Sequence, residues 1–290
     1  MEIDIKQRVR EFYNSVGWRE IGEGVYQNAR YEDLRLVVRE YIHRCHLRVG
    51  YHLLSHGTFL LDGGSGPIQY PEYLEYSRGY RYRLCLDISE LALVEARKRI
   101  GDNGLFVVGD IANQPFKDNA FEGVVSMHTV HHLPAGEQRR AFFEFHRVLR
   151  PGARAVVVSS WGKHSPIGRL LKGPTALAFR LIRVYRRLRG FDEVQHKLPG
   201  VEVSPETTAL LQTPGSFTHS HSYRWLVKNI GRLPNLEVRV WRSIPTSFMR
   251  AFIHRHLLGQ QLLRVLFWLE ERLPHFIGRV GQYPMILFEK

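Results

Sequence analysis

An apolar run that ends in an acid and passes directly into a cluster of glycines is the feature that most constrains this chain. Residues 59–62 read Phe-Leu-Leu-Asp, and residues 63–66 read Gly-Gly-Ser-Gly. The run is typical of a buried strand, and the glycines let the backbone turn tightly and approach a ligand. The sequence therefore predicts a strand, a ligand-binding turn and then a helix. Because an ordinary tight turn can look the same, the downstream sequence has to decide between the two.

The downstream sequence alternates short β-rich runs with amphipathic helical stretches, which predicts an α/β fold on a parallel sheet. Ser89 is expected to cap a helix with Leu91, Val94 and Ala96 on one side. The other expected helices are residues 135–149, which Pro151 and Gly152 end, and residues 223–230. The expected strands are residues 58–62, 82–87, 105–109, 121–127, 153–160, 236–241 and 285–288.

Acids stand at the ends of the first three expected strands. Asp87 is placed to accept hydrogen bonds from ribose hydroxyls, although a lone strand-end aspartate is more often a helix cap. The carboxylate of Asp110 can accept the exocyclic amine of adenine while Ile111 packs against the ring. With Asp62, the ordered set favours a nucleoside-containing cofactor. An NAD enzyme would need a further glycine where this chain has Gln69.

Residues 59–158 resemble the class I S-adenosylmethionine-dependent methyltransferases, in the small-molecule branch that includes the ubiquinone and menaquinone methyltransferases. The resemblance implies a Rossmann-like sheet of seven strands whose last strand is antiparallel, with a helical N-terminal segment and helical insertions that form a substrate lid. It is carried by the glycine loop and by residues 86–89, 109–111, 115–116, 121–125, 130–133 and 147–152.

The resemblance also implies the cofactor, S-adenosyl-L-methionine, and the residues that hold it. Gly64 and Gly66 would lie under its methionine part. Ile68 stands where the family usually has a third glycine, which is expected to narrow the mouth of the loop without abolishing binding. The expected cofactor-binding residues are Asp62, Gly63, Gly64, Ser65, Gly66, Asp87, Ile88, Asp110, Ile111 and Met127.

Methyl transfer depends mainly on holding the acceptor in line with the methyl group, and a base is needed only when the acceptor must lose a proton. His128 and His131 follow the fourth expected strand and are the candidate general bases, with His132 beside them. The alternative is that these histidines only shape the turn.

Two further histidine pairs raise the question of a metal. His43 with His46, and His219 with His221, lack a set of Cys, Asp or Glu at ligand spacing, apart from Cys45. We therefore expect surface or lid histidines and no metal.

Three segments lie outside the alternation. Residues 1–50 are expected to form a helical N-terminal lid segment ahead of the methyltransferase domain, residues 51–290. That domain is interrupted by a basic helical insertion, residues 161–220, and by a helical insertion at residues 245–280, where apolar residues recur at helical spacing.

The charge balance indicates an anionic partner. The chain has 41 Lys and Arg residues and 28 Asp and Glu residues, which gives a formal net charge of +13. Residues 174–189 are expected to form a basic amphipathic helix, typical of segments that contact anionic membranes. The alternative is an ordinary lid with solvated arginines. The sequence contains no RNA-binding module, which disfavours nucleic acid.

The sequence thus predicts a methyltransferase that acts by direct in-line transfer on a small-molecule or a lipid- or glycan-linked acceptor. An RNA-directed methyltransferase, or a non-catalytic S-adenosylmethionine-binding protein of the same fold, remains the alternative. The first residues lack the pattern of a signal peptide, and no apolar stretch could span a bilayer. We expect a cytoplasmic protein, with peripheral contact to the inner membrane face left open, as are the acceptor, the methylated atom and the oligomeric state.

Overall fold

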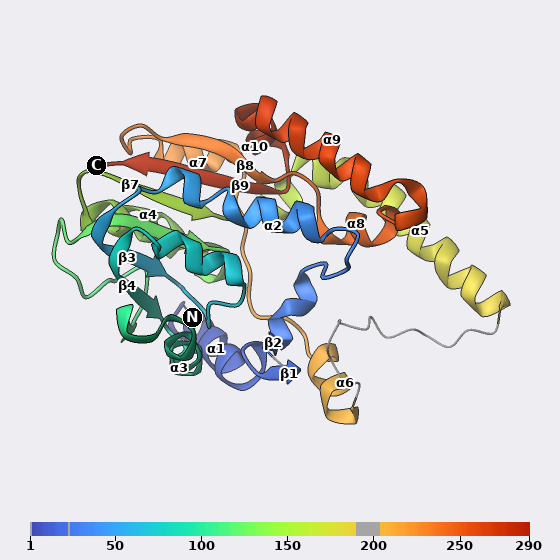
Figure 1. Cartoon of the computed structure of the whole chain (residues 1–290), viewed down its shortest axis with the longest axis horizontal. Helices are drawn as coiled ribbons and strands as arrows, with labels where there is room; N and C mark the ends of the chain where they lie inside the picture. Colours follow the sequence, from blue (N-terminus) through green and yellow to red (C-terminus); the bar gives the residue numbers. More distant parts are fainter. Residues whose placement is uncertain (1, 23, 190–203) are drawn as a thin grey trace.

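A seven-stranded sheet forms the centre of the computed structural model, which describes all residues except 1, 23 and 190–203 (Figure 1). The strand order is β5-β4-β3-β6-β7-β9-β8, and β9 runs antiparallel between β7 and β8. This confirms the predicted Rossmann-like sheet with its last strand antiparallel. Its strands are β3 (Gly57–Gly63), β4 (Tyr80–Asp87), β5 (Gly104–Val108), β6 (Phe121–Met127), β7 (Leu149–Val158), β8 (Glu237–Arg242) and β9 (Tyr283–Glu289).

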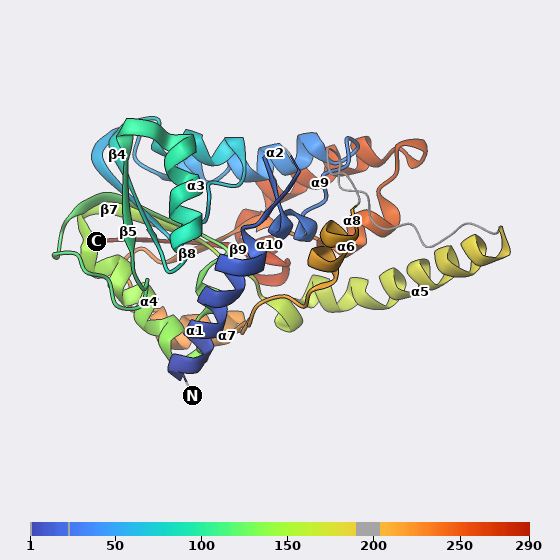
Figure 2. The ribbon, with the colours of Figure 1, turned by 90° about the horizontal axis from the view of Figure 1, so that it is seen from below.

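Helices cover both faces of this sheet, because successive strand residues point to opposite sides (Figure 2). Leu60 and Cys85 belong to a core shared with α2 (Arg39–Leu47), α3 (Glu90–Ile100) and α9 (Gly259–Arg272). Leu61 and Leu86 belong to the opposite core, which includes α4 (Ala135–Val148) and α7 (Tyr223–Ile230). The sheet therefore has two separate apolar layers, as an α/β fold requires.

The N-terminal segment combines several helices with one small sheet. It begins with α1 (Glu2–Phe12) and a single π-helical turn, η1 (Tyr13–Gly17). A small antiparallel pair, β1 (Glu20–Gly22) with β2 (Val25–Tyr26), and a 3-10 helix, η2 (Gln27–Tyr31), then lead to α2. The division of the chain into residues 1–50 and 51–290 stays a prediction.

The prediction of a helix directly after the glycine loop is wrong. The chain forms only a 3-10 helix there, η4 (Pro71–Ser77), before β4 begins. Pro71 occupies the first turn of this 3-10 helix, a position that proline favours. Tyr73 and Tyr76 of the same short helix pack into the core beside α2.

The helix after β4 forms as predicted but presents a different face. Ser89 is its N-cap, since its hydroxyl accepts a hydrogen bond from the Ala92 amide. Its buried residues include Leu93 and Ala96, whereas Val94 is 50% exposed. The element was predictable from the cap, but its orientation depends on the neighbours it packs against.

Residues 245–280 form three helices where one was predicted. These are α8 (Thr246–Phe252), α9 and α10 (Pro274–Val280), with a 3-10 turn, η8 (Arg255–Leu257), between the first two. Leu258 adopts a left-handed backbone conformation (φ 54°) before α9, and Pro274 ends one helix and begins the next.

The basic helix is longer than predicted and projects from the body of the molecule (Figures 1 and 2). As α5 (Pro166–Leu188) it begins well before Pro174, because Ser165 caps it and Pro166 occupies its first turn. The rest of the predicted 161–220 insertion includes α6 (Pro205–Gln212), while residues 190–203 lie outside the described residues. Within the described part of the chain, no helix is long and apolar enough to cross a membrane.

Candidate cofactor and acceptor site

A cavity of about 580 Å³ lies at the carboxyl ends of the parallel strands, where α/β proteins bind their ligands. Its floor is the loop after β3 together with the residues that follow β4, β5 and β6. Its cover comes from α1, from η1 and from residues 215–220. The cavity is therefore a junction between the sheet edge and segments far apart in the sequence.

The glycine loop is built so that only glycine fits at two positions. Gly64 and Gly66 have positive φ angles of 74° and 56°. A Cβ on Gly64 would collide with the Thr129 side chain, and one on Gly66 would lie 3.0 Å from the Trp18 ring. Ile68 keeps the left-handed conformation of the missing third glycine, with φ 55°, and its side chain is fully buried. The loop is therefore shaped so that a ligand can approach its backbone closely.

Asp87 ties this loop to the end of β4. Its Oδ2 accepts from the Gly66 amide at 2.9 Å and its Oδ1 from the Ser89 amide at 2.8 Å. Burial raises the pKa of Asp87 to about 6. Ser89, and not Asp87, is the helix N-cap. The carboxylate therefore belongs to the cavity wall, where ribose hydroxyls would reach it.

Asp110 lies at the next strand end and is covered by α1. Its Oδ1 accepts from the Ala112 amide at 2.8 Å, and Lys6 of α1 donates to its Oδ2 at 2.8 Å. Lys6 also pairs with Glu137 at 2.7 Å. Ile111 lines the cavity beside this group. The N-terminal helix is thus fastened over the adenine side of the predicted site.

Most of the residues predicted from the sequence come together here. The cavity is lined by Gly64, Ser65, Gly66, Asp87, Ile88, Asp110, Ile111, Met127, His128 and His131. Asp62 and Gly63 do not line it. Asp62 is 2% exposed and forms a buried ion pair with Arg83, and Gly63 lies against Phe145. The signal for this pairing was Arg83, a cation inside an otherwise apolar strand that needs a buried partner.

The candidate general bases are deeply buried. Burial lowers the pKa of His128 to about 3, with Arg242 nearby adding to the effect, and lowers that of His131 well below its usual value. His128 and His131 are therefore neutral at pH 7, and each would hold an added proton only weakly. Nε2 of His132 forms a hydrogen bond with the Tyr13 hydroxyl, and the two atoms are 3.0 Å apart. Catalysis by His128 or His131 stays a prediction.

The far end of the cavity contains residues that the sequence reasoning missed. Glu32 follows η2, and Arg242 ends β8; their side chains pair at 2.5 Å. The Arg242 guanidinium lies 5.1 Å and 4.7 Å from the centres of the Trp241 and Tyr283 rings. This aromatic and charged end is suited to an acceptor with polar groups. A charged residue at the end of an apolar strand was the available signal for Arg242.

His46 is buried, so its placement among surface or lid histidines was wrong. It is 1% exposed and lies between Tyr70 and Trp241, with ring centres 4.6 Å and 5.6 Å away. His221 instead stacks on Trp225 at 3.5 Å. Across the described residues, no group of three or more His, Cys, Asp or Glu is arranged to hold a metal ion.

Comparisons with known proteins indicate a methyltransferase domain. The sequence model of a family described as a methyltransferase domain matches residues 61–157. The chain is 36% identical over 109 residues to the ubiquinone/menaquinone biosynthesis C-methyltransferase UbiE of Roseobacter denitrificans, covering 35% of this chain and 42% of that protein. It is 39% identical over 64 residues to a "Probable tocopherol O-methyltransferase, chloroplastic" of Oryza sativa subsp. japonica, covering 22% and 17%. The chain thus spans less than half the length of either relative.

Two solved structures are similar to nearly the whole chain. One is geranyl diphosphate C-methyltransferase from Streptomyces coelicolor A3(2) in complex with Mg²⁺, geranyl diphosphate and S-adenosyl-L-homocysteine; it has a TM-score of 0.51 at 16% identity and covers 98% of this chain and 97% of that one. The other is a geranyl diphosphate methyltransferase with GPP and sinefungin, with a TM-score of 0.52 at 14% identity, covering 98% and 99%. At these identities the similarity concerns the fold alone.

The chain has the fold of the class I methyltransferases. Residues 61–157 match the methyltransferase-domain family that the sequence motifs indicated.

Proposed function

We propose that the protein transfers a methyl group from S-adenosylmethionine to a small-molecule acceptor bound in the same cavity. The observation that carries the proposal is continuity: one cavity joins the glycine cradle and Asp87 to the polar aromatic end at Glu32 and Arg242. Its volume of about 580 Å³ lies within the range of roughly 300–1,000 Å³ that is usual for small-ligand sites.

The chain's own residues divide the work between two halves of the cavity. Gly64 and Gly66 would hold the methionine part, Asp87 the ribose, and Asp110 with Ile111 the adenine. The bound cofactor supplies an activated methyl group. The remaining task is to hold the acceptor in line and to exclude water, which raises the rate through proximity and orientation.

The cover over the cavity supports a small acceptor or the end of a lipid- or glycan-linked one. Residues of α1 and η1, among them Phe12 and Tyr13, close one side, and residues 215–220 close another. The backbone of this second segment is fastened to the floor, since the His219 amide donates to the His131 carbonyl at 2.7 Å. A nucleotide of a folded RNA would have to displace this cover.

Calorimetric titration with S-adenosyl-L-homocysteine tests the proposal. We expect one site per chain, no requirement for added metal, and no heat with NAD as the matched control. The absence of both heat and a thermal shift at millimolar S-adenosyl-L-homocysteine would refute it.

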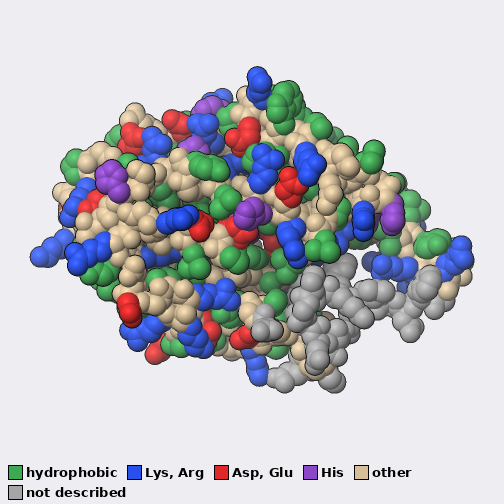
Figure 3. Space-filling view, viewed as in Figure 1, with side chains coloured by type: hydrophobic (Ala, Val, Ile, Leu, Met, Phe, Trp, Pro, Cys, Tyr) green, Lys and Arg blue, Asp and Glu red, His purple; other side chains and the backbone are tan. Residues whose placement is uncertain are grey.

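We further propose that α5 gives the enzyme peripheral contact with the anionic inner face of a membrane. Leu177, Leu181 and Leu188 are 58%, 61% and 82% exposed. Figure 3 shows basic and hydrophobic side chains together at the projecting end of this helix. Among the described residues, no acidic side chain forms an ion pair with Arg183, Arg186, Arg187 or Arg189. Each basic residue near an anionic surface contributes about 1 kcal/mol, so several together support reversible binding.

Sedimentation with anionic and neutral liposomes tests this contact. The variant changes Arg183, Arg186, Arg187 and Arg189 to Gln. The matched control removes the same charge elsewhere, by changing the exposed Lys117, Arg224, Lys228 and Arg232 to Gln. We expect salt-sensitive pelleting with anionic vesicles that the first variant loses and the control keeps. Equal pelleting of both variants, or none by the wild type, would leave α5 as a lid.

A further inference from the structure

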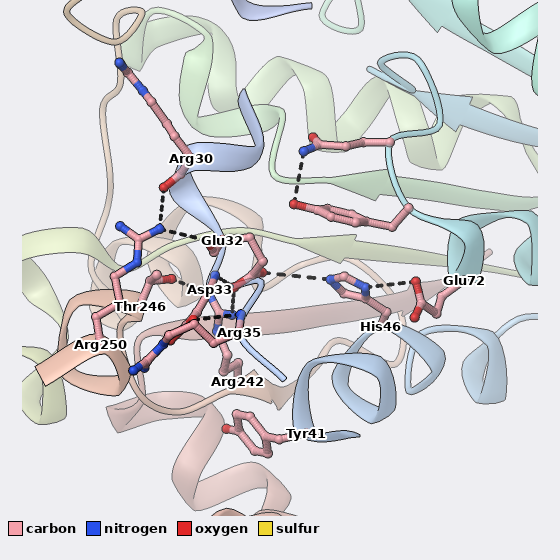
Figure 4. A network of polar contacts seen from close by, with 12 residues as sticks. Arg30, Glu32, Asp33, Arg35, Tyr41, His46, Glu72, Arg242, Thr246 and Arg250 are labelled. Atoms are coloured by element: carbon pink, nitrogen blue, oxygen red, sulfur yellow. Dashed lines mark hydrogen bonds and ion pairs between the residues drawn. The ribbon is translucent and has the colours of Figure 1, made fainter. Parts of the chain in front are cut away.

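A chain of polar side chains leads from the acceptor end of the cavity to the surface, and Figure 4 shows its first three members, Glu32, His46 and Glu72. Glu32 lines the cavity, and its Oε2 lies 4.0 Å from Nε2 of His46 on α2. Nδ1 of His46 lies 3.4 Å from Oε2 of Glu72 on η4, whose Oε1 is 2.6 Å from Nδ1 of His43. The His43 side chain is 52% exposed. The four groups therefore form a path from the buried cavity to solvent.

The partners of His46 determine which ring nitrogen carries its proton. Burial alone would raise the pKa of Glu72, but hydrogen bonds with His46 and His43 outweigh it and lower that pKa to about 2. An ionised carboxylate only accepts hydrogen bonds, so in the neutral ring Nδ1 of His46 carries the proton. Nε2 then presents a lone pair, and it is buried without a hydrogen-bond partner in the described structure.

The opposing oxygen of Glu32 is also an acceptor. Oε1 of Glu32 is already held, because the Asp33 amide donates to it at 3.0 Å and Arg242 donates to it at 2.5 Å. In the described chain, Oε2 makes no hydrogen bond and faces His46. Two acceptors thus oppose each other with no proton between them, and a buried acceptor such as Nε2 of His46 is destabilising when it is left unsatisfied. A single added proton would turn this mismatch into a hydrogen bond.

We infer that Glu32 takes the proton from the methyl acceptor and that His46 passes it on toward the surface. This inference rests on the proposed methyltransferase function. For an O–H acceptor, the oxygen forms a bond to the methyl carbon as the carbon–sulfur bond breaks, and that electron pair stays on sulfur. The acceptor proton moves to Oε2 of Glu32 and then to Nε2 of His46. The Nδ1 proton leaves through Glu72 and His43 to solvent, so the ring ends neutral.

The surroundings fix the geometry of this pair. The His46 ring is held by Tyr70, Tyr73 and Trp241, with ring centres between 4.6 and 5.6 Å away. The charged or titratable groups around it are Glu32, Glu72, Arg242, Tyr70, Tyr73 and His128. Glu32 is the catalytic residue in this account, and His46 is a positioning residue that acts through it.

4-Nitrophenol tests the inference without knowledge of the natural acceptor. It is an O–H acid whose phenolate absorbs visible light, so proton transfer is read directly from the spectrum. The protein is saturated with S-adenosyl-L-homocysteine, and the pH is set about one unit below the pKa of the free phenol, where about a tenth of it is ionised. We expect wild-type protein to convert most of the bound probe to phenolate.

Variants then assign the proton acceptor. Glu32→Gln alone would leave the Arg242 cation unpaired, and that cation would favour phenolate, so the test combines Glu32→Gln with Arg242→Gln. This double variant is expected to lower the phenolate fraction of the bound probe by about fivefold or more. His46→Gln leaves the Glu32–Arg242 pair in place and is expected to lower the phenolate fraction of the bound probe by about threefold. It serves as the test if the first variant folds poorly. His256→Gln is the matched control, because it removes an exposed imidazole outside the cavity and should leave the phenolate fraction unchanged.

The outcomes separate this inference from the proposed function. An unchanged phenolate band in the Glu32→Gln/Arg242→Gln and His46→Gln variants, its loss in His256→Gln, or no phenolate in the wild type would overturn the inference. Calorimetry on the same samples reports S-adenosyl-L-homocysteine binding independently. Failure of that binding in the wild type would instead count against the proposed function.

Discussion

The pH dependence of cofactor binding should be governed by Asp87. Burial raises the pKa of Asp87 to about 6, although the amides of Ser89 and Gly66 oppose this by donating hydrogen bonds to the carboxylate. If the ionised carboxylate accepts the ribose hydroxyls, protonation removes the acceptor that the ligand needs. The affinity for S-adenosyl-L-homocysteine should therefore fall as the pH is lowered through 6.

The expected magnitude follows from the fraction of ionised Asp87. About one unit below its pKa, roughly a tenth of the carboxylate is ionised, so affinity falls about tenfold, or about 1.4 kcal/mol. Burial lowers the pKa values of His128 and His132 to about 3 and 4. These histidines remain neutral across the range and do not contribute. Asp87→Asn should abolish the pH dependence and weaken binding by tens of fold, since each charge-assisted hydrogen bond contributes about 1.5–3 kcal/mol.

The assay is calorimetric titration with S-adenosyl-L-homocysteine from about pH 5 to about pH 8, a range that brackets the shifted carboxyl. The matched control is Asp102→Asn, which removes an exposed aspartate and should keep the wild-type profile. Circular dichroism verifies that Asp87→Asn is folded. A dissociation constant that does not change with pH in the wild type, or a pH dependence that survives in Asp87→Asn, would refute the reasoning.

Three further predictions concern residues around the cavity. Lys6→Ala removes the ion pair between α1 and Asp110, which is worth about 0.2–1 kcal/mol. In stopped-flow experiments, S-adenosyl-L-homocysteine should therefore dissociate about 1.5- to 5-fold faster. An unchanged dissociation rate would mean that this contact of α1 does not retain the ligand. Asp62→Asn leaves the buried Arg83 without its charged partner and should lower the free energy of unfolding in urea titrations by about 3–5 kcal/mol. Unchanged stability with a large loss of affinity for S-adenosyl-L-homocysteine would instead make Asp62 a ligand-binding residue. Ile68→Gly relieves a left-handed backbone but deletes a fully buried side chain, so a net loss of about 1–3 kcal/mol is expected; a stabilised variant would show that strain dominates.

Local sequence patterns predicted the sheet well because each strand carries its own signal. The apolar run at residues 121–127 became β6 with the same bounds, and residues 223–230 became α7. The errors arose where neighbours decide the outcome. Val94 is exposed because the packing of α3 selects Leu93 and Ala96 for burial. The predicted start of α5 at residue 174 is wrong because Ser165 caps the helix and Pro174 lies inside it.

The candidate site divides in the same way. Gly64, Gly66, Asp87 and Asp110 are local to the strand ends, so motif and order were enough to bring them together. The acceptor end depends on contacts across the whole chain: Glu32 and Arg242 are 210 positions apart in sequence. No local pattern joins such residues, because the N-terminal segment places Glu32 and the end of β8 places Arg242. The same holds for the burial of His46 between segments from three parts of the chain.

A crystal structure with bound S-adenosyl-L-homocysteine tests the central claim most directly. The account predicts the ribose hydroxyls on the Asp87 carboxylate, the adenine between Asp110 and Ile111, and the sulfur facing the part of the cavity that leads to Glu32 and Arg242. A ligand bound elsewhere, or a sulfur turned away from that end, would contradict it.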